Sequence, residues 1–549
     1  VTVRFKEPAR HFTASAPLGN GRIGAMVFGN TNRARIVLNE ISMWSGGVQD
    51  ADSKEAGKYL PQIRELLLEG KNIEAQKVLQ KYFICQGPGS GSGNGANVKF
   101  GCYQTLGDLF IQWKDTASVV HHYQRRLRLD SALSTVTWER NGVEYKEEVM
   151  VSAPQQVAVI RLTAGKPGGL SFTTGLYRKE RANIRVVNGM VQMNGALNGG
   201  DNDEGVQYAA ILKVISKGGK EVQSKDQITI SGADECILLV AARTNMNWPK
   251  VETPGPAPTA QTVADINKAA SLSWPALLQA HVKDYASFFN RCRISFTDNS
   301  NEEVKDLSAI ARLERLQQGH KDASLVSLYF NFGRYLLISS SRNGGMPANL
   351  QGLWAEEYQT PWNGDYHLDI NIQMNHWPID EVNLPMLNQP YYALVKGLVE
   401  PGEKTAAVYY HAKGWVAHAI TNVWGYTSPG EHPSWGATNI GSGWVCNDLW
   451  DHYAFTSDKA YLEKIYPILK GSAAFYLSSM IPENKHGWLV TAPSNSPENA
   501  FLLPNDHEAS VCMGPTIDNQ IIRELFAHVM EASVLLKKDT AFREALKRA

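Results

Sequence analysis

The first half of the chain alternates apolar and polar residues over short runs, which is typical of half-buried β-strands. The alternation is clearest in residues 98–113, 123–164 and 206–216. Turn signals such as Asn141-Gly142 separate the runs. Many short strands at regular spacing are typical of a large antiparallel sandwich. We therefore predict an N-terminal β-sandwich over residues 1–262.

A different period interrupts this pattern at residues 56–80. The runs PQIRELLLEG and IEAQKVLQKYF place apolar residues three and four positions apart, which predicts a helical insert. The sequence GPGSGSGNG follows at residues 87–95. Its composition indicates a flexible surface loop that contributes nothing to a core.

After a Pro-rich segment at residues 248–262, the apolar residues take up a helical period. We expect a helical linker at 263–302 and a long helix over LVSLYFNFGRYLLISSSR. Long loops rich in Trp, Gly, Asn and Pro alternate with the later helices. This arrangement suits an (α/α)6 barrel over residues 303–549, with loops lining one end. Further helices are predicted at 385–410, 443–455, 459–480 and 516–536.

Composition narrows the possible partners and cofactors. The 549 residues are 43% hydrophobic with a formal net charge of +0, so no global field favours nucleic acid. No apolar run is long enough for membrane insertion, and the start VTVRFKEPARHF is not a signal peptide. The six cysteines form no CxxC pair. For Cys85 and Cys102, free buried thiols are favoured over a disulfide.

Two segments carry the candidate chemistry: WNGDYHLDINIQMNHWP at 362–378 and APSNSPENAF at 492–501. Aromatic rings hold sugars, and carboxylates with amides can steer a water, as glycoside hydrolysis requires. Glu498 is the candidate proton donor, or else the first turn of a helix. Asp369 and Asn371 alternate, so an extended segment would point both towards one water; the alternative is a polar loop tied by its own hydrogen bonds.

Other motifs are weak. Residues 19–24, GNGRIG, match the dinucleotide pattern GxGxxG, but strand-like residues follow them where a helix is needed. A β-turn near the sandwich edge is favoured. His376 and His418 do not have a metal-binding spacing, and Ser494 and Ser496 lack the GxSxG elbow. We expect no cofactor and no metal.

The chain resembles glycoside hydrolase family 95, whose members are α-L-fucosidases with some α-L-galactosidases. The matching stretches are APLGNGRIGAMVFGN, LNEISMWSGG, NLQGLWAEEYQTPWNGDYHLDINIQMNHWP, GWVCNDLWDHYAFTSD, GWLVTAPSNSPEN and TIDNQIIRELF. The resemblance implies a β-sandwich, a helical linker, an (α/α)6 barrel and a small C-terminal β domain. It also implies inversion of the anomeric configuration and a secreted or periplasmic location.

The resemblance assigns roles to particular residues. It implies that Glu498 is the general acid, that Asn371 is one of two water-positioning asparagines, and that His367 binds the sugar. Trp444 matches a family tryptophan near the sugar. Two further tryptophans, Trp362 and Trp424, are candidates for stacking on the sugar.

Two departures from the family pattern bear on the mechanism. Asp369 stands where the family has the first asparagine, so it could take a proton from water itself or repel the true base. The family's catalytic Asp lies far beyond the acid, so we expect the barrel to be incomplete and the base to lie beyond Ala549. The resulting hypothesis is an inverting exo-α-L-fucosidase. An α-L-galactosidase and a catalytically silent carbohydrate-binding protein are the alternatives, and the oligomeric state stays open.

Overall fold

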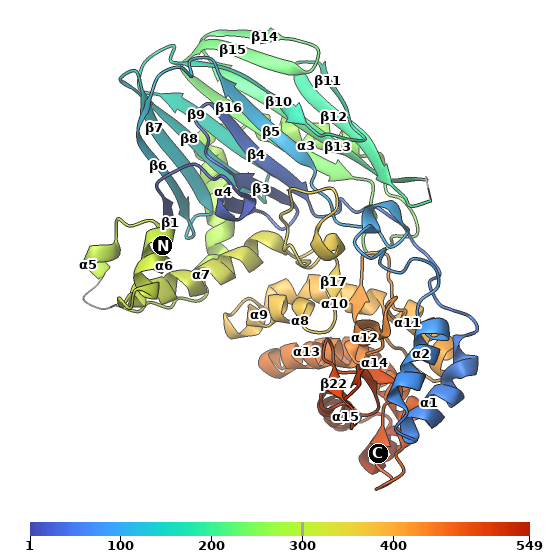
Figure 1. Ribbon diagram of the computed structural model, residues 1–549. Helices are drawn as coiled ribbons and strands as arrows, with labels where there is room; N and C mark the ends of the chain where they lie inside the picture. Colours follow the sequence, from blue (N-terminus) through green and yellow to red (C-terminus); the bar gives the residue numbers. More distant parts are fainter. Residues whose placement is uncertain (202, 298–300, 505) are drawn as a thin grey trace.

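Two antiparallel sheets form the first half of the molecule, as predicted (Figure 1). The computed structural model describes residues 1–201, 203–297, 301–504 and 506–549, with the side chains of 301 and 302 left out. The nine-stranded sheet has the order β1-β6-β7-β8-β9-β16-β13-β12-β11. Its strands are β1 Thr2–Phe5, β6 Val120–Arg128, β7 Leu133–Arg140, β8 Val143–Ser152, β9 Val157–Ala164, β16 Glu235–Thr244, β13 Glu204–Lys217, β12 Met190–Asn198 and β11 Asn183–Val187.

The seven-stranded sheet has the order β14-β15-β10-β5-β4-β3-β2. Alternate side chains of both sheets point into one apolar core, where Leu109 and Ile111 of one sheet and Leu238 and Val240 of the other are buried. This is the period-two pattern read from the sequence. The strands are β14 Lys220–Gln223, β15 Gln227–Ala233, β10 Leu170–Tyr177, β5 Gly107–Trp113, β4 Arg33–Glu40, β3 Ile23–Val27 and β2 Ala16–Gly19.

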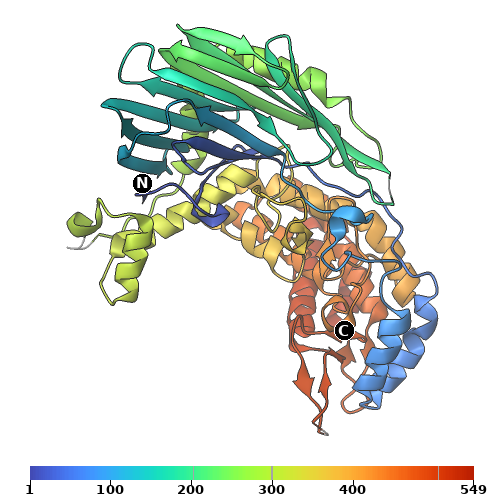
Figure 2. The ribbon, with the colours of Figure 1, turned by 45° about the horizontal axis from the view of Figure 1, so that its top comes forward.

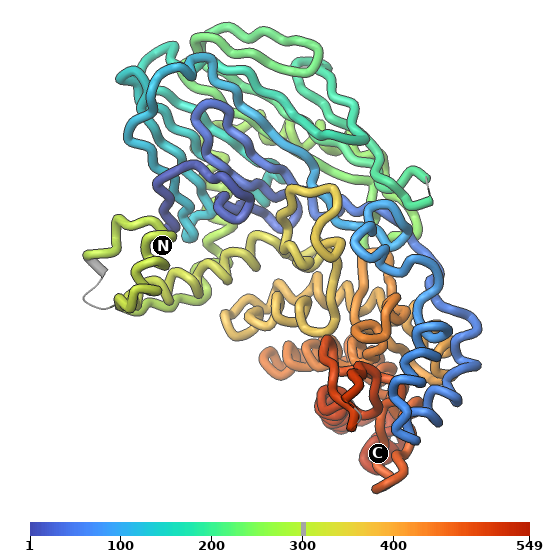
Figure 3. The backbone as a smooth tube through the Cα atoms, in the orientation of Figure 1, coloured from blue at the N-terminus to red at the C-terminus, as the bar shows by residue number. Residues whose placement is uncertain are grey.

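The predicted insert is helical and leaves the sandwich. It consists of η2 Ala56–Tyr59, α1 Leu60–Leu68 and α2 Asn72–Tyr82. Figures 2 and 3 show this helical pair beside the C-terminal segments rather than beside the sheets. Arg64 donates from Nε to the carbonyl of Ala492 at 3.0 Å, and Asn72 donates to that of Val511 at 3.0 Å. The insert therefore braces the part of the chain that carries Glu498.

Helices make up most of the second half. α3 begins at Pro258, inside the Pro-rich segment and before the start of the predicted helical linker, and its residues Ile266 and Ala269 pack on the nine-stranded sheet. The helices predicted near 385–410, 443–455, 459–480 and 516–536 are present. None of the described helices combines the length and apolarity needed to cross a bilayer. The helices are α3 Pro258–Ala270, α4 Trp274–Phe289, α5 Asn301–Val304, α6 Ala309–Gln317, α7 Ala323–Ser340, α8 Asn371–His376, α9 Pro378–Glu381, α10 Asn388–Gly397, α11 Val399–Tyr410, α12 Pro433–Gly436, α13 Gly441–Thr456, α14 Lys459–Ser479, α15 Thr516–Leu536 and α16 Thr540–Arg548.

The GNGRIG segment is a hairpin turn between β2 and β3, as favoured from the sequence. The turn docks on the end of α7, where the Gly21 N–H donates to the carbonyl of Ser339 at 2.8 Å. A Cβ on Gly19 would lie 2.3 Å from the same oxygen. Glycine is needed here for close contact between the two halves of the molecule, not for a phosphate.

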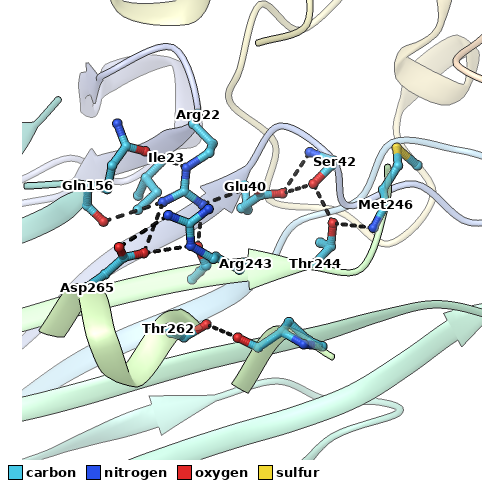
Figure 4. Close-up of polar contacts among 12 residues, drawn as sticks. Arg22, Ile23, Glu40, Ser42, Gln156, Arg243, Thr244, Met246, Thr262 and Asp265 are labelled. Carbon is cyan, nitrogen blue, oxygen red and sulfur yellow. Dashed lines mark hydrogen bonds and ion pairs between the residues drawn. The ribbon is translucent and has the colours of Figure 1, made fainter. Parts of the chain in front are cut away.

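Arg22 in this turn joins a partly buried ion network (Figure 4). Its Nη1 lies 3.3 Å from Glu40 Oε1, and its Nε donates to Gln156 Oε1 at 2.5 Å. Asp265 of α3 lies 3.9 Å from Arg22 and 2.7 Å from Arg243. Burial lowers the pKa of Arg22, an effect that Glu40 and Asp265 oppose. The network ties the hairpin to α3 and the nine-stranded sheet.

Candidate active site

The candidate segment at residues 362–378 contains a short strand in the helical half of the molecule. β17 Tyr366–His367 pairs with β18 Ile420–Thr421, and the Leu368 N–H donates to the carbonyl of Ala419 at 2.7 Å. The chain then turns sharply at Ile370, whose φ is 149°, and α8 begins at Asn371. The extended segment predicted through residue 371 is therefore wrong beyond the turn. Asp369 lies in the turn, whereas the exposed Asn371 starts the helix.

Glu498 lies in a loop between two small strand pairs. β21 Ser494–Asn495 pairs with β24 Val511–Cys512, and β22 Phe501–Leu502 pairs with β23 Glu508–Ala509. Residues 496–500 are not helical, so the alternative role of Glu498 at a helix start is excluded. The remaining small strand pair is β19 Ile481–Pro482 with β20 Leu489–Val490.

These two segments meet at one cavity of about 450 Å³. Glu498, Asp369, His367 and Trp362 all contribute to its wall, although 131 positions separate His367 from Glu498 in the sequence. The other lining residues come from the glycine-rich loop, from the segment just before β17, and from the segment that begins just before β18 and continues beyond it. They are Ser90, Ser92, Gly93, Asn363, Asp365, Ala419, Ile420, Glu431, His432 and Trp435.

An ion pair lies in the cavity wall. His367 Nε2 is 3.0 Å from Asp365 Oδ1, and Asp365 is 1% exposed. Burial raises the pKa of Asp365, which His367 partly offsets. Burial alone would lower the pKa of His367, but Asp365, with smaller effects from Asp369 and Glu498, outweighs it and raises that pKa. The carboxyl group of Asp365 thus stabilises the protonated form of His367.

Asp369 is a half-buried carboxylate in the same wall. Burial raises its pKa, and Glu498 adds to the rise while His367 opposes it. Its Oδ1 is buried and has no hydrogen-bond partner among the described residues. Glu498 thus disfavours the charged form of Asp369, an interaction between neighbouring carboxyl groups that is common in sites of acid–base catalysis.

Two tryptophans border the cavity in different ways. Trp362 is 72% exposed at its edge. Trp435 is half-buried in α12, and its ring lies against Gly430, where a Cβ would approach it to 2.2 Å. Asn495 next to the Glu498 loop donates to the carbonyl of Ser434 at 2.8 Å. The Trp435 segment and the Glu498 loop are therefore held together.

The other predicted residues lie elsewhere. Trp424 lines a second cavity of about 370 Å³ and donates from Nε1 to the carbonyl of Ser45 at 2.9 Å. Trp444 is half-buried on α13 and does not line the Glu498 cavity. His376 and His418 are buried, which lowers the pKa of each to about 4. Both donate from Nδ1 to backbone carbonyls, which gives them structural roles.

Several cavity residues were missed by the sequence reasoning. Asp365 had a usable signal, because Asp365, His367 and Asp369 alternate and now line one cavity. Trp435 and Glu431 had none, since they follow the other strand of the small sheet, more than fifty positions away. The glycine-rich loop was expected to be a flexible surface loop. It is instead hydrogen-bonded to the cavity wall through Ser90 and Ser92.

Comparison with known proteins shows which family the chain belongs to. Residues 273–549 match the glycosyl hydrolase family 95 catalytic domain, and residues 3–248 match the glycosyl hydrolase family 65 N-terminal domain. The chain belongs to glycosyl hydrolase family 95. All the cavity residues named above, except those of the glycine-rich loop, lie within the family 95 match.

Individual members of family 95 are similar over almost the whole chain. Alpha-L-fucosidase 2 of Arabidopsis thaliana is 34% identical, and the match covers 97% of this chain and 65% of that protein. Probable alpha-fucosidase A of Aspergillus niger is 31% identical over 97% of this chain and 67% of its own length. The chain thus spans about two thirds of the length of these relatives.

A solved structure described as a putative kojibiose phosphorylase from human microbiome has a similar fold. The TM-score is 0.62 at 11% sequence identity, and the match covers 99% of this chain and 69% of that chain. At this identity the likeness concerns the fold alone. It agrees with the sandwich and the following helical region predicted from the sequence.

Proposed function

We propose that this protein is an inverting exo-glycosidase that hydrolyses terminal α-L-fucosyl residues of oligo- or polysaccharides. The observation that carries the proposal is the cavity in which Glu498 and Asp369 meet beside His367 and two tryptophans. The names of the family 95 relatives support fucose as the sugar. Secretion or periplasmic location is proposed from the family resemblance, and cell fractionation tests it.

In this mechanism Glu498 protonates the glycosidic oxygen as the bond to the leaving group breaks. Asp369 holds the water that attacks the anomeric carbon from the opposite face. Its buried, unpartnered oxygen and its raised pKa suit a group that accepts a proton from that water. The protonated His367, oriented by Asp365, donates to a sugar hydroxyl. We assign water positioning to Asp369 rather than to Asn371, which is outside the cavity lining.

Release of nitrophenol from nitrophenyl α-L-fucoside by the purified protein tests the proposal. Proton NMR must show β-L-fucose as the first anomer formed, since inversion turns an α-linkage into a β-product. We expect Glu498→Gln to lower kcat about 10²–10⁴-fold, the usual contribution of general acid catalysis. Glu508→Gln is the matched control, because this exposed glutamate lies on β23 next to the same loop and outside the cavity lining.

The alternatives give different results in the same assay. Faster turnover of the α-L-galactoside would identify an α-L-galactosidase, whose substrate differs by one hydroxyl group at C6. Binding of L-fucose without turnover of either glycoside would identify a silent carbohydrate-binding protein. Unchanged turnover in Glu498→Gln would remove Glu498 from the mechanism.

A further inference from the structure

The glycine-rich loop at residues 87–95 reaches the cavity from the other half of the molecule. It follows α2, the helix that braces the Glu498 region, and Ser90, Ser92 and Gly93 line the cavity. The rest of the cavity wall comes from segments beyond residue 361. One wall of the site is therefore supplied by the loop that follows the helical insert.

Hydrogen bonds hold this loop to the cavity residue Glu431. The backbone N–H of Ser90 donates to Glu431 Oε2 at 3.2 Å, and the Ser90 hydroxyl donates to Oε1. The Ser92 hydroxyl also donates to Oε1, at 3.3 Å. On the backbone side, Gln80 of α2 donates to the carbonyl of Glu431 at 3.1 Å. The loop thus holds the side chain of Glu431, and α2 holds its backbone.

The same loop holds a second cavity residue. The carbonyl of Ser90 accepts a hydrogen bond from Asn363 Nδ2 at 2.9 Å. Asn363 has a left-handed backbone with φ of 59°, a conformation that needs support from its surroundings. Ser90 therefore bridges Glu431 and Asn363 across the cavity wall.

The glycines in the loop are required by close approach. A Cβ on Gly89 would lie 2.5 Å from Glu431 Oε2, and one on Gly95 would lie 2.2 Å from Asn363 Oδ1. Gly89 also has a left-handed φ of +58°. The composition that indicated a flexible surface loop instead permits the backbone to pack directly on two polar side chains.

The Glu431 carboxylate keeps capacity for a ligand. An ionised carboxylate has about four acceptor positions, and the described residues fill three of them. It is fixed in place before any ligand arrives, so little side-chain entropy is lost on binding. A charged acceptor in a fixed position suits the hydroxyl groups of a sugar, which donate strong hydrogen bonds to carboxylates.

We propose that Glu431 is a substrate-binding residue that accepts a hydrogen bond from a hydroxyl group of the sugar bound beside Glu498, and that Ser90 is its positioning residue. This inference rests on the proposed glycosidase function and names a specificity determinant of the same site. Its competitor is a purely structural role, in which Glu431 only anchors the loop.

Substrate analogues separate the two roles. The experiment measures kcat and KM for nitrophenyl α-L-fucoside and for its 2-, 3- and 4-deoxy forms, with wild type, Glu431→Gln and Ser90→Ala. A hydrogen bond to a charged group predicts that Glu431→Gln lowers kcat/KM about 10–100-fold on the intact substrate, mainly through KM. On the one analogue that lacks the bound hydroxyl, the variant and wild type should differ less than threefold. Ser90→Ala should show the same pattern with a smaller loss.

Two further variants serve as controls for this experiment. Glu403→Gln changes an exposed glutamate of α11 outside the cavity lining and should leave all four substrates unaffected. Glu431→Asp retains the charge and should recover part of the loss, which also covers the case that Glu431→Gln misfolds. Equal losses on the intact substrate and all analogues would overturn the inference and leave the glycosidase function standing. If wild type neither binds nor hydrolyses the fucoside, the proposed function fails first and takes this inference with it.

Discussion

The sandwich and the cavity differ in how their charged groups are arranged. In the sandwich, the charge of Arg22 is met by Glu40 and Asp265, and left-handed residues such as Asn141 and Asn188 lie in hairpin turns that call for them. In the cavity, several carboxylates crowd together, and non-glycine residues are left-handed in the lining segments themselves. Charge repulsion and backbone strain of this kind destabilise the folded state, and they are retained where they serve binding or chemistry. Changes in the sandwich should therefore alter stability, and changes in the cavity should alter turnover.

The largest effect is expected from breaking the ion network of the sandwich. Arg22→Met leaves Glu40, which is 2% exposed, without its cation. Loss of one partner of a buried pair costs about 3–5 kcal/mol, so the free energy of unfolding in urea should fall by that amount. Arg126→Met on the exposed face of β6 is the control and should change it by less than about 0.5 kcal/mol. A small effect of Arg22→Met would show that the network is dispensable.

A change in the cavity should show the reverse pattern. Asp369→Asn keeps the shape of the side chain but cannot accept a proton, so kcat on the fucoside should fall about 10²–10³-fold. Burial already disfavours the charged form of Asp369, so Tm at pH 7 should be unchanged or slightly higher. Asp226→Asn, exposed in a sandwich turn, should change neither quantity. A drop in Tm that accounts for the lost activity would contradict the catalytic role.

Glu147 sharpens the comparison, because it is a buried carboxyl in the sandwich with no catalytic neighbour. Burial raises its pKa from 4.5 to about 7, and its Oε1 has no hydrogen-bond partner among the described residues. The folded state therefore binds the proton more tightly than the unfolded state does. The resulting stability is complete below the unfolded pKa and is lost as the pH rises through about 7.

Substitution at this position gives a measurable pH effect. Glu147→Gln should raise Tm relative to wild type at pH 8.5 but not at pH 4.5. The gain in unfolding free energy of the variant over wild type should be about 1–3 kcal/mol larger at pH 8.5 than at pH 4.5. Glu144→Gln on the same strand is exposed and should show no such dependence. Activity on the fucoside should be retained in both variants. An equal change at the two pH values would contradict the assignment.

The smallest effect is expected at the cavity edge. Trp362 is 72% exposed, so its loss costs little packing and removes only a surface against which a sugar ring can rest. Trp362→Ala should raise KM for the fucoside about 2–10-fold with little change in kcat or Tm, in line with roughly 0.5–1.5 kcal/mol for an aromatic contact. Trp488→Ala, at another exposed tryptophan outside the cavity, is the control. Equal KM values in wild type and Trp362→Ala would remove Trp362 from substrate binding.

Alternating apolar residues were sufficient to predict the sandwich, and the helical period predicted the insert and most later helices. Both signals come from side chains a few positions apart, whose spacing decides which face of one element is buried. The chemistry of the residues singled out Glu498 and Asp369, and the family resemblance then assigned roles to Glu498 and His367. The extended stretch through Asn371 failed because one residue, Ile370, turns the chain, and no local pattern encodes that turn.

The remaining parts of the cavity depend on contacts that no local period carries. Ser90 meets Glu431 and Asn363 across about 270–340 positions of sequence, and Trp435 meets the Glu498 loop through Asn495 and Ser434. Residues that are neighbours in sequence acquire their secondary structure from side-chain spacing and backbone sterics. Which distant segments then share a cavity is settled only when the insert packs on the helical half and the loop glycines let the backbone approach the side chains of Glu431 and Asn363.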